Sequence, residues 1–176
     1  MKTIPIVVCA LSAGMNLLAQ AQAPKLPWGI GPQSVIPIDV PVDIRRAVGD
    51  GLEYDDGVPI KGVTADFDGD GVHEFLLQSA PSLCGSGGCV YVLCDGATHR
   101  TLGEFFGSPL YVRAERTRGY PNVATYSHLS ADSAAYTEYS FDGTSYIVTS
   151  KRTLAGPAAD RMSETLSQIP IWKPTP

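Results

Sequence analysis

The chain has 176 residues, of which 18 are acidic and 13 are Lys or Arg, and its net charge is −5. This length is sufficient for one domain with its own hydrophobic core. The acidic balance argues against binding to nucleic acids or to anionic membrane surfaces, because both require clustered Lys and Arg. It is compatible with a cation site or with a basic protein partner.

The first 21 residues are organised as a secretory signal peptide. Lys2 supplies a positive charge, an apolar stretch runs from Ile6 to about Leu18, and Ala19-Gln20-Ala21 matches the small-x-small pattern of a cleavage site. A membrane anchor is the alternative, but the apolar stretch is shorter than the ~20 residues that span a bilayer. We therefore expect cleavage after Ala21, a periplasmic or secreted protein, and no membrane insertion after cleavage.

Residues 22–50 are expected to form an extended, Pro-rich leader with one short helix. Proline fixes the backbone angle φ and removes an amide donor, so repeated prolines oppose regular hydrogen-bonded structure. The spacing of Val42, Ile44 and Val48 is loosely helical and predicts a helix within residues 39–48. The prolines of the leader are Pro24, Pro27, Pro32, Pro37 and Pro41.

Residues 51–155 have the pattern of a β domain. Short apolar or alternating stretches are separated by turn residues, and Asp142-Gly143 marks the clearest hairpin. The pattern predicts a mainly β fold: an antiparallel meander that forms a half-rolled sheet or a small barrel, with one or two short helices. Residues 156–176 are expected to form a C-terminal helix, at 158–168, and a tail. The predicted strands are 60–65, 74–79, 90–94, 101–106, 110–115, 123–128, 135–141 and 145–150.

The nine residues from Asp66 to Glu74 give the strongest indication of a chemical role. This loop places carboxylates at positions 1, 3, 5 and 9, and its two glycines permit a tight bend. Ca²⁺ takes about 6–8 oxygen ligands, and a cation would relieve the repulsion between closely spaced carboxylates. The predicted Ca²⁺ ligands are Asp66, Asp68, Asp70, the backbone carbonyl of Val72, and Glu74.

The acidic loop resembles the calcium loops of FG-GAP and VCBS-type modules and of integrin-like blades. The shared pattern is Asp-x-Asp-x-Asp-Gly-x-x-acid between two strands, and it covers residues 63–79. An EF-hand is less similar, because its Glu at position 12 would be Leu77 here. The resemblance implies a structural Ca²⁺ site, with Glu74 where Asp is more usual. A metal-free turn held by Asx hydrogen bonds is the alternative.

Three cysteines follow the expected cleavage site, at positions 84, 89 and 94. A disulfide is expected in an exported protein, and the glycines between Cys84 and Cys89 let the chain turn back within disulfide reach. Cys94 is then a buried thiol or pairs with another chain. A zinc site that adds His99 to the three cysteines is disfavoured, because strand residues five apart face opposite sides.

A second resemblance combines three segments. A Cys-Gly-x-Gly-Gly-Cys loop follows the Asp-x-Asp-Gly-Asp-Gly hairpin, and Tyr-x-Phe-Asp-Gly-x-x-Tyr occupies residues 139–146. The combination is similar to small, uncharacterised periplasmic proteins of Gram-negative bacteria over roughly residues 63–148. It implies a periplasmic location and a β fold, and it does not indicate which reaction, if any, the protein catalyses.

No catalytic set is complete in the sequence, which contains neither a Gly-x-Ser-x-Gly elbow nor a Gly-rich phosphate loop before a helix. A Cys94–His128 dyad and a Glu104–Glu115 acid–base pair are alternatives without support from spacing.

The aromatic residues of the last four predicted strands are expected to lie in the core or in cross-strand pairs. We call them the late aromatic residues: Tyr111, Tyr126, Tyr136, Tyr139, Phe141 and Tyr146. An outward-facing patch of Tyr136 and Tyr146 with Arg113 and Arg116 is the alternative.

We therefore expect a non-enzymatic, calcium-binding β domain that binds another periplasmic or secreted protein, as an inhibitor or immunity factor. A small size, an acidic surface, a cross-linked scaffold and the lack of a catalytic set favour this interpretation. One alternative is a small cell-envelope hydrolase that uses carboxylates or the bound metal. Another is a structural accessory module.

Overall fold

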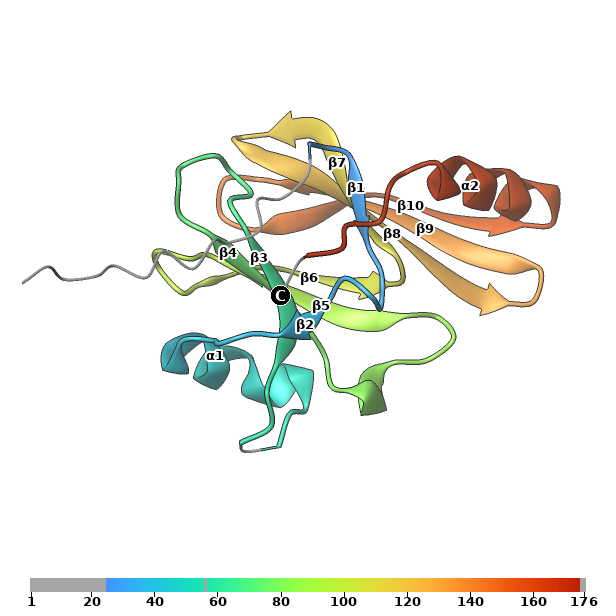
Figure 1. The fold of residues 1–176 in the computed structure, drawn as a ribbon. Helices are drawn as coiled ribbons and strands as arrows, with labels where there is room; N and C mark the ends of the chain where they lie inside the picture. Colours follow the sequence, from blue (N-terminus) through green and yellow to red (C-terminus); the bar gives the residue numbers. More distant parts are fainter. Residues whose placement is uncertain (1–24, 56, 175–176) are drawn as a thin grey trace, which may run out of the picture.

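Two antiparallel five-stranded sheets form the centre of the molecule (Figure 1). The computed structural model describes residues 25–174 except residue 56, so the predicted signal peptide lies outside the described residues. The mainly β fold is confirmed, and the strands of the described part form two sheets instead of a closed barrel. Within the same part of the chain, no helix is long and apolar enough to cross a membrane.

The first sheet has the order β1-β7-β8-β9-β10, and the second has the order β2-β3-β4-β5-β6. The strands of the first sheet are β1 (Trp28–Ile30), β7 (Leu110–Thr117), β8 (Tyr120–Ser130), β9 (Ser133–Phe141) and β10 (Tyr146–Ala155). Those of the second are β2 (Ile36–Pro37), β3 (Lys61–Ala65), β4 (Glu74–Gln78), β5 (Cys89–Cys94) and β6 (Thr101–Gly107). A short 3₁₀ helix, η1 (Pro81–Leu83), lies between β4 and β5.

Side-chain alternation explains how the sheets form a sandwich. In β5, Cys89, Tyr91 and Leu93 belong to the core between the sheets, whereas Val92 and Cys94 belong to a second cluster outside it. Successive side chains of a strand point to opposite faces, so β5 contributes to both clusters. Both faces of this strand are apolar because both are covered.

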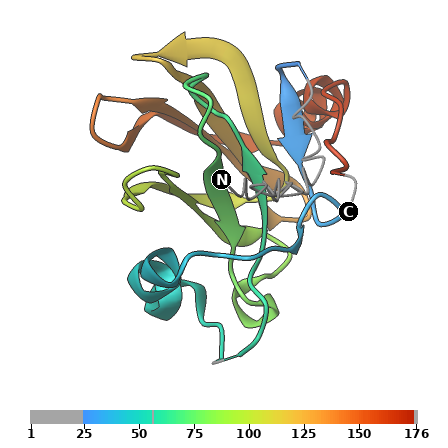
Figure 2. The same ribbon diagram turned by 60° about the vertical axis from the view of Figure 1, so that its left-hand side comes forward.

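The two helices lie on opposite sides of the sandwich (Figure 2). Helix α1 (Val42–Leu52) packs Ile44, Val48 and Leu52 against the second sheet. These residues follow the four-residue spacing of one helix face. The predicted helix is present, shifted toward the C-terminus.

Helix α2 (Pro157–Ser167) covers part of the outer face of the first sheet. It begins directly after Gly156 and carries Pro157 in its first turn, where the missing amide donor is not needed. Leu166 packs there in a cluster with Tyr111, Tyr126 and Tyr136. The predicted C-terminal helix is therefore confirmed, one residue earlier than expected.

The Pro-rich leader, which was expected to oppose regular hydrogen-bonded structure, contributes the short strands β1 and β2 to the two sheets. β1 pairs with β7, far along the chain, and Gly29 also exchanges backbone hydrogen bonds with Pro170 and Trp172, at 2.8 and 2.9 Å. Trp28 packs against Trp172 with ring centroids 4.9 Å apart. Tertiary contacts with both β7 and the C-terminal segment thus order this Pro-rich stretch.

Candidate functional site

The acidic loop connects β3 and β4, whose register pairs Ala65 with Glu74. Gly69 and Gly71 both have a φ of +90°, which L side chains rarely adopt, so glycine is required for this bend. The carboxylate of Asp66 accepts hydrogen bonds from the backbone N–H groups of both glycines, at 2.6 and 3.1 Å. These are the local hydrogen bonds expected of an Asp/Gly turn, whether or not a cation is bound.

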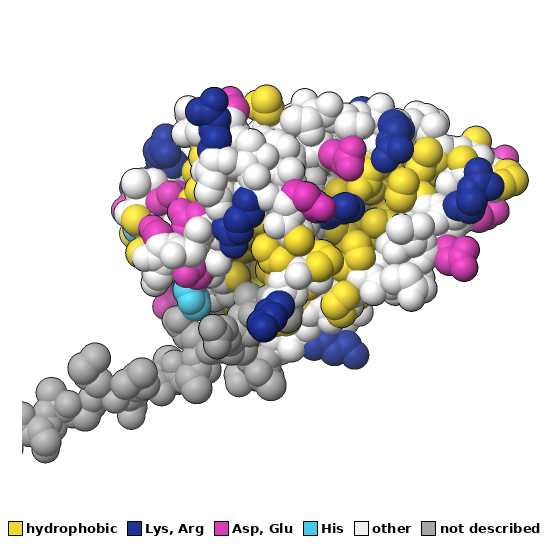
Figure 3. Space-filling model, turned by 90° about the horizontal axis from the view of Figure 1, so that it is seen from above, with side chains coloured by type: hydrophobic (Ala, Val, Ile, Leu, Met, Phe, Trp, Pro, Cys, Tyr) yellow, Lys and Arg dark blue, Asp and Glu magenta, His cyan; other side chains and the backbone are white. Residues whose placement is uncertain are grey.

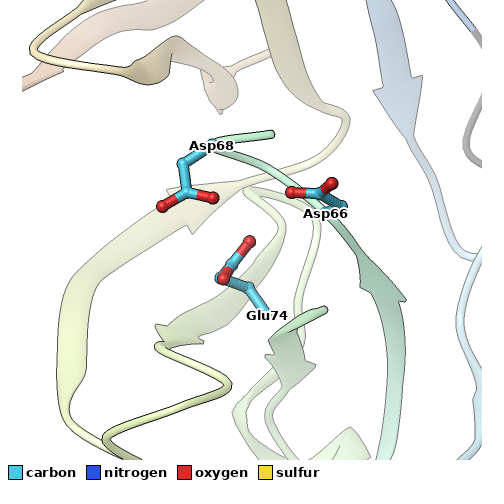
Figure 4. A group of neighbouring side chains, drawn as sticks. All are labelled: Asp66, Asp68 and Glu74. Atoms are coloured by element: carbon cyan, nitrogen blue, oxygen red, sulfur yellow. The ribbon is translucent and has the colours of Figure 1, made fainter. Parts of the chain in front are cut away.

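Three of the predicted ligand side chains converge. Carboxylate oxygens of Asp66, Asp68 and Glu74 lie within 4.8 Å of one another, and the three side chains point toward a common centre (Figure 4). Glu74 is only 2% exposed and accepts a hydrogen bond of 2.7 Å from the Phe67 backbone N–H. The loop therefore holds one buried and two half-buried carboxylates together.

A fourth predicted ligand side chain, that of Asp70, lies differently, and the backbone carbonyl of Val72 stays a predicted ligand. Asp70 is exposed and does not belong to the group of three; its Oδ1 accepts a hydrogen bond of 2.7 Å from the Val72 backbone N–H. Val72 itself is 40% exposed. The converging set therefore consists of Asp66, Asp68 and Glu74.

Burial makes Glu74 a weaker acid than an ordinary glutamate. Its pKa is raised from 4.5 to about 7, chiefly because burial disfavours the charged form, while the Phe67 N–H partly offsets the shift. The negative charges of Asp68 and Asp70 raise this pKa further. A cation between the carboxylates would favour the charged form of Glu74 and so lower its pKa. Because all the converging atoms are oxygens, the set fits a hard cation such as Ca²⁺ better than a soft one.

Two residues that the sequence analysis did not assign to the loop support it. Arg116 of β7 donates from Nη1 to the carbonyl oxygens of Phe67 and Asp68, at 2.9 and 3.3 Å, which ties the loop to the first sheet. The pKa of Tyr120 is raised by burial and by the charges of Glu74 and Asp68, so its phenol stays neutral beside the acidic group. Neither residue is close to the loop in sequence, and no local pattern could have revealed the contact.

A cavity of about 420 Å³ adjoins the acidic loop. Asp66 and His73 of the loop line it together with Trp28 and Arg116. The Nδ1 atom of His73 is buried and, among the described residues, has no hydrogen-bond partner. Asp66, one of the three converging residues, therefore borders a hollow that is lined by both apolar and charged side chains.

The predicted disulfide between Cys84 and Cys89 is confirmed. Between the cysteines, Gly85 and Gly88 exchange backbone hydrogen bonds of 2.8 and 3.0 Å, which leaves Ser86 exposed at the tip of a tight turn. A Cβ atom on Gly88 would lie 2.5 Å from the Cα atom of Gly107, so only glycine fits there. The disulfide and this close backbone approach fix the loop against β6.

Two exposed apolar residues lie on strands next to the disulfide loop. Phe106 of β6 is 48% exposed and Leu129 of β8 is 58% exposed. A Cβ atom built on Gly87 would lie 3.5 Å from the Phe106 ring and 3.2 Å from the carbonyl oxygen of His128, next to Leu129. We define the loop patch as Cys84–Cys89, Phe106 and Leu129.

The catalytic and zinc alternatives gain no support. Cys84 and Cys89 are oxidised, and Cys94 is a buried free thiol whose pKa is raised to about 11 by burial. A thiol this weakly acidic is a poor nucleophile at neutral pH. Glu104 and Glu115 lie on strands of different sheets. Glu115 instead pairs with Arg113, at 3.4 Å.

The core placement of the late aromatic residues is confirmed. Tyr136 is 2% exposed and Tyr146 is 8% exposed, so neither forms the outward patch considered from the sequence. The Tyr146 hydroxyl donates to the carbonyl oxygen of Pro121, at 2.7 Å. The Tyr136 hydroxyl accepts a hydrogen bond of 3.2 Å from Arg113, so one pairing of that patch exists at the edge of the core.

Comparison with known proteins identified no relative of this chain. No protein family, curated protein or solved structure matches the chain. Inferences about function therefore rest on the acidic loop, the loop patch and the hollows in the surface.

Proposed function

We propose that the protein is an exported β domain that binds Ca²⁺ at the acidic loop and binds another protein through the loop patch, as an inhibitor or immunity factor. The observation that carries the protein-binding part is the exposed, cross-linked turn beside the exposed residues Phe106 and Leu129. Apolar side chains around a pre-organised loop bind with little loss of conformational entropy. The net acidic charge favours a basic partner.

Calcium has a structural role in this proposal. The convergence of Asp66, Asp68 and Glu74 supports a cation site, as does the resemblance of the loop to FG-GAP and VCBS-type calcium loops. Binding would relieve the cost of holding Glu74 charged inside the protein. The ion would then stabilise the β3–β4 connection, which Arg116 ties to the first sheet.

Site-specific photo-cross-linking in the native cells tests the binding surface. A photoreactive residue at Ser86, the tip of the loop patch, should give a cross-linked product of defined mass. The same residue at Thr144, which is exposed in the β9–β10 turn, should not. The partner, once identified and purified, should bind the double variant Phe106→Ser/Leu129→Ser at least tenfold more weakly. Equal binding of this variant and the wild type would refute the loop patch as the interface.

A metal-dependent hydrolase is a second candidate, and one observation favours it: the cavity of about 420 Å³ borders Asp66 and contains His73 and Arg116. A metal held by the loop would face a hollow able to hold part of a substrate. The assay measures hydrolysis of purified cell-envelope material by the wild type and two variants. Activity would favour this candidate if it needs Ca²⁺, is lost in Asp66→Asn and survives in Asp70→Asn. Unchanged material under all conditions would favour the binding protein.

A further inference from the structure

A surface groove crosses the outer face of the first sheet beside α2. Its larger part, about 440 Å³, is lined by residues that include Arg113, Tyr136, Arg152, Met162, Leu166 and Ile169. A second hollow of about 230 Å³ shares Arg113, Glu115 and Glu138 with it, so the two hollows are adjacent. Figure 3, seen from above, shows hydrophobic side chains lying between basic and acidic ones on this side of the molecule.

Tyr136 organises the charged residues of the groove. Its hydroxyl accepts a hydrogen bond from Arg113, at 3.2 Å, and donates one to Glu138, at 3.3 Å. The guanidinium of Arg152 lies over the Tyr136 ring, 5.0 Å from its centroid. These contacts hold two cations and one carboxylate around a single buried phenol, next to the apolar side chains of α2.

Arg152 is the cation that remains available to a ligand. Arg113 already pairs with Glu115, at 3.4 Å, whereas within the described part of the chain Arg152 makes no ion pair. Stacking on an aromatic ring leaves the edge donors of a guanidinium free, and these match a carboxylate in a bidentate arrangement. The nearby carboxylate of Glu138 accepts one hydrogen bond from Tyr136 and can accept more, for example from a peptide N–H.

We propose that this groove binds the C-terminus of a partner polypeptide that ends in an apolar residue. The terminal carboxylate pairs with Arg152, a backbone N–H of the peptide donates to Glu138, and the terminal side chain lies among Met162, Leu166 and Ile169. The acceptor capacity of Glu138 favours a peptide, which carries backbone N–H donors, over a fatty acid, which has none. This site lies on the first sheet, so it is separate from the proposed Ca²⁺ loop and goes beyond the function proposed above.

A peptide-binding assay with matched variants tests the proposal. The full chain is expressed, and the purified protein is labelled. Its binding is measured to immobilised octapeptides that end in Leu, Phe, Asp or Lys, each as the free acid and as the C-terminal amide. We expect the Leu and Phe acids to bind at least tenfold more strongly than their amides and than the Asp and Lys acids. Equal binding of acids and amides, or no binding to either apolar acid, would overturn the proposal.

The neighbouring residues on β10 provide the matched control. Arg152→Gln should lower the affinity for the Leu acid at least tenfold, whereas Lys151→Gln removes the same charge from an exposed residue outside the groove and should change it less than twofold. Equal losses in the two variants would indicate non-specific charge attraction and would also overturn the proposal. Thermal melting of both variants verifies that they are folded. The loop-patch variant Phe106→Ser should bind the peptide normally.

Discussion

The backbone N–H of Phe67 donates a hydrogen bond of 2.7 Å to the buried carboxylate of Glu74, across the base of the acidic loop. This bond holds the Glu74 side chain beneath Asp66 and Asp68 although burial opposes its charge. The first and last acidic residues of the loop are thus brought together by the β3–β4 register and by one backbone donor. Four predictions concern this geometry and the disulfide.

The first prediction concerns calcium itself. Asp68→Asn removes a charge from the converging group and should weaken Ca²⁺ binding at least tenfold in a calorimetric titration, because it leaves fewer anionic ligands around the ion. Asp70→Asn changes an exposed carboxylate outside that group and should have a smaller effect. Saturating Ca²⁺, at about 100 times the Kd, should stabilise the wild type by ~2.7 kcal/mol. A melting temperature that does not respond to Ca²⁺ or chelator would contradict the site.

The second prediction concerns the charge of Glu74. Glu74→Gln keeps an oxygen acceptor for the Phe67 N–H and removes the buried charge. In chelator at pH 8 it should stabilise the protein by ~1–2 kcal/mol, after allowance for solvent screening. Thermal melting should therefore shift upward by about 3–6 °C. In saturating Ca²⁺ the order should reverse, because the variant has lost a charged ligand. A variant less stable than the wild type in chelator would show that the charge is not costly.

The third prediction concerns pH. The folded-state pKa of Glu74, about 7, is above its ordinary value of 4.5, so between these values the folded protein retains a proton that the unfolded chain has lost. In chelator, this group therefore lowers the stability as the pH rises from 4.5 to about 7, and the loss levels off above that range.

Melting curves of the wild type and Glu74→Gln across that range measure this contribution as a difference. The pKa of Asp142 is lowered by the N–H groups of Ser145 and Thr144, so it titrates at lower pH and does not enter the comparison. The stability difference between the two proteins should be small at pH 4.5 and largest near pH 8. Parallel curves would contradict the assignment to Glu74.

The fourth prediction concerns the cysteines. The double variant Cys84→Ala/Cys89→Ala removes a cross-link over a sequence separation of five, which should cost ~2 kcal/mol in chemical denaturation from loop entropy alone. In the wild type without residues 1–21, a thiol reagent should modify no cysteine in the native state and one, Cys94, in denaturant. Modification of Cys94 in the folded protein would contradict its burial.

Local patterns in the sequence were enough to locate the long strands. The continuously apolar run from Val90 to Cys94 predicted a strand covered on both faces. In the structure its period of two packs Tyr91 and Leu93 on one face and Val92 and Cys94 on the other. The same period placed Cys89 and Cys94 on opposite faces, as the structure has them. The Asp142-Gly143 hairpin was equally local, because the Asp142 side chain accepts hydrogen bonds from the two N–H groups that follow the glycine.

Long-range pairings could not be derived in this way. β1 has three residues and its pairing partner β7 begins at Leu110, so no local alternation identifies it. Tyr136 has the same alternation whether its face meets water or α2, and the helix contact decides its burial. For the acidic loop, the sequence was enough to predict that carboxylates gather there. Which of them converge, without Asp70, and the hydrogen bonds from Arg116 depend on the fold.

The contacts of β1 determine when the domain can finish folding. Ser34 donates a hydrogen bond to the carbonyl oxygen of Trp172, 138 residues further along the chain, and Gly29 is paired to the same segment. During synthesis, Trp28 can pack against Phe67 and pair with β7 before its last partner, Trp172, has left the ribosome. Contacts of such long sequence separation slow folding. In the export proposed above, the core would therefore be complete only after the segment around Trp172 had crossed the membrane.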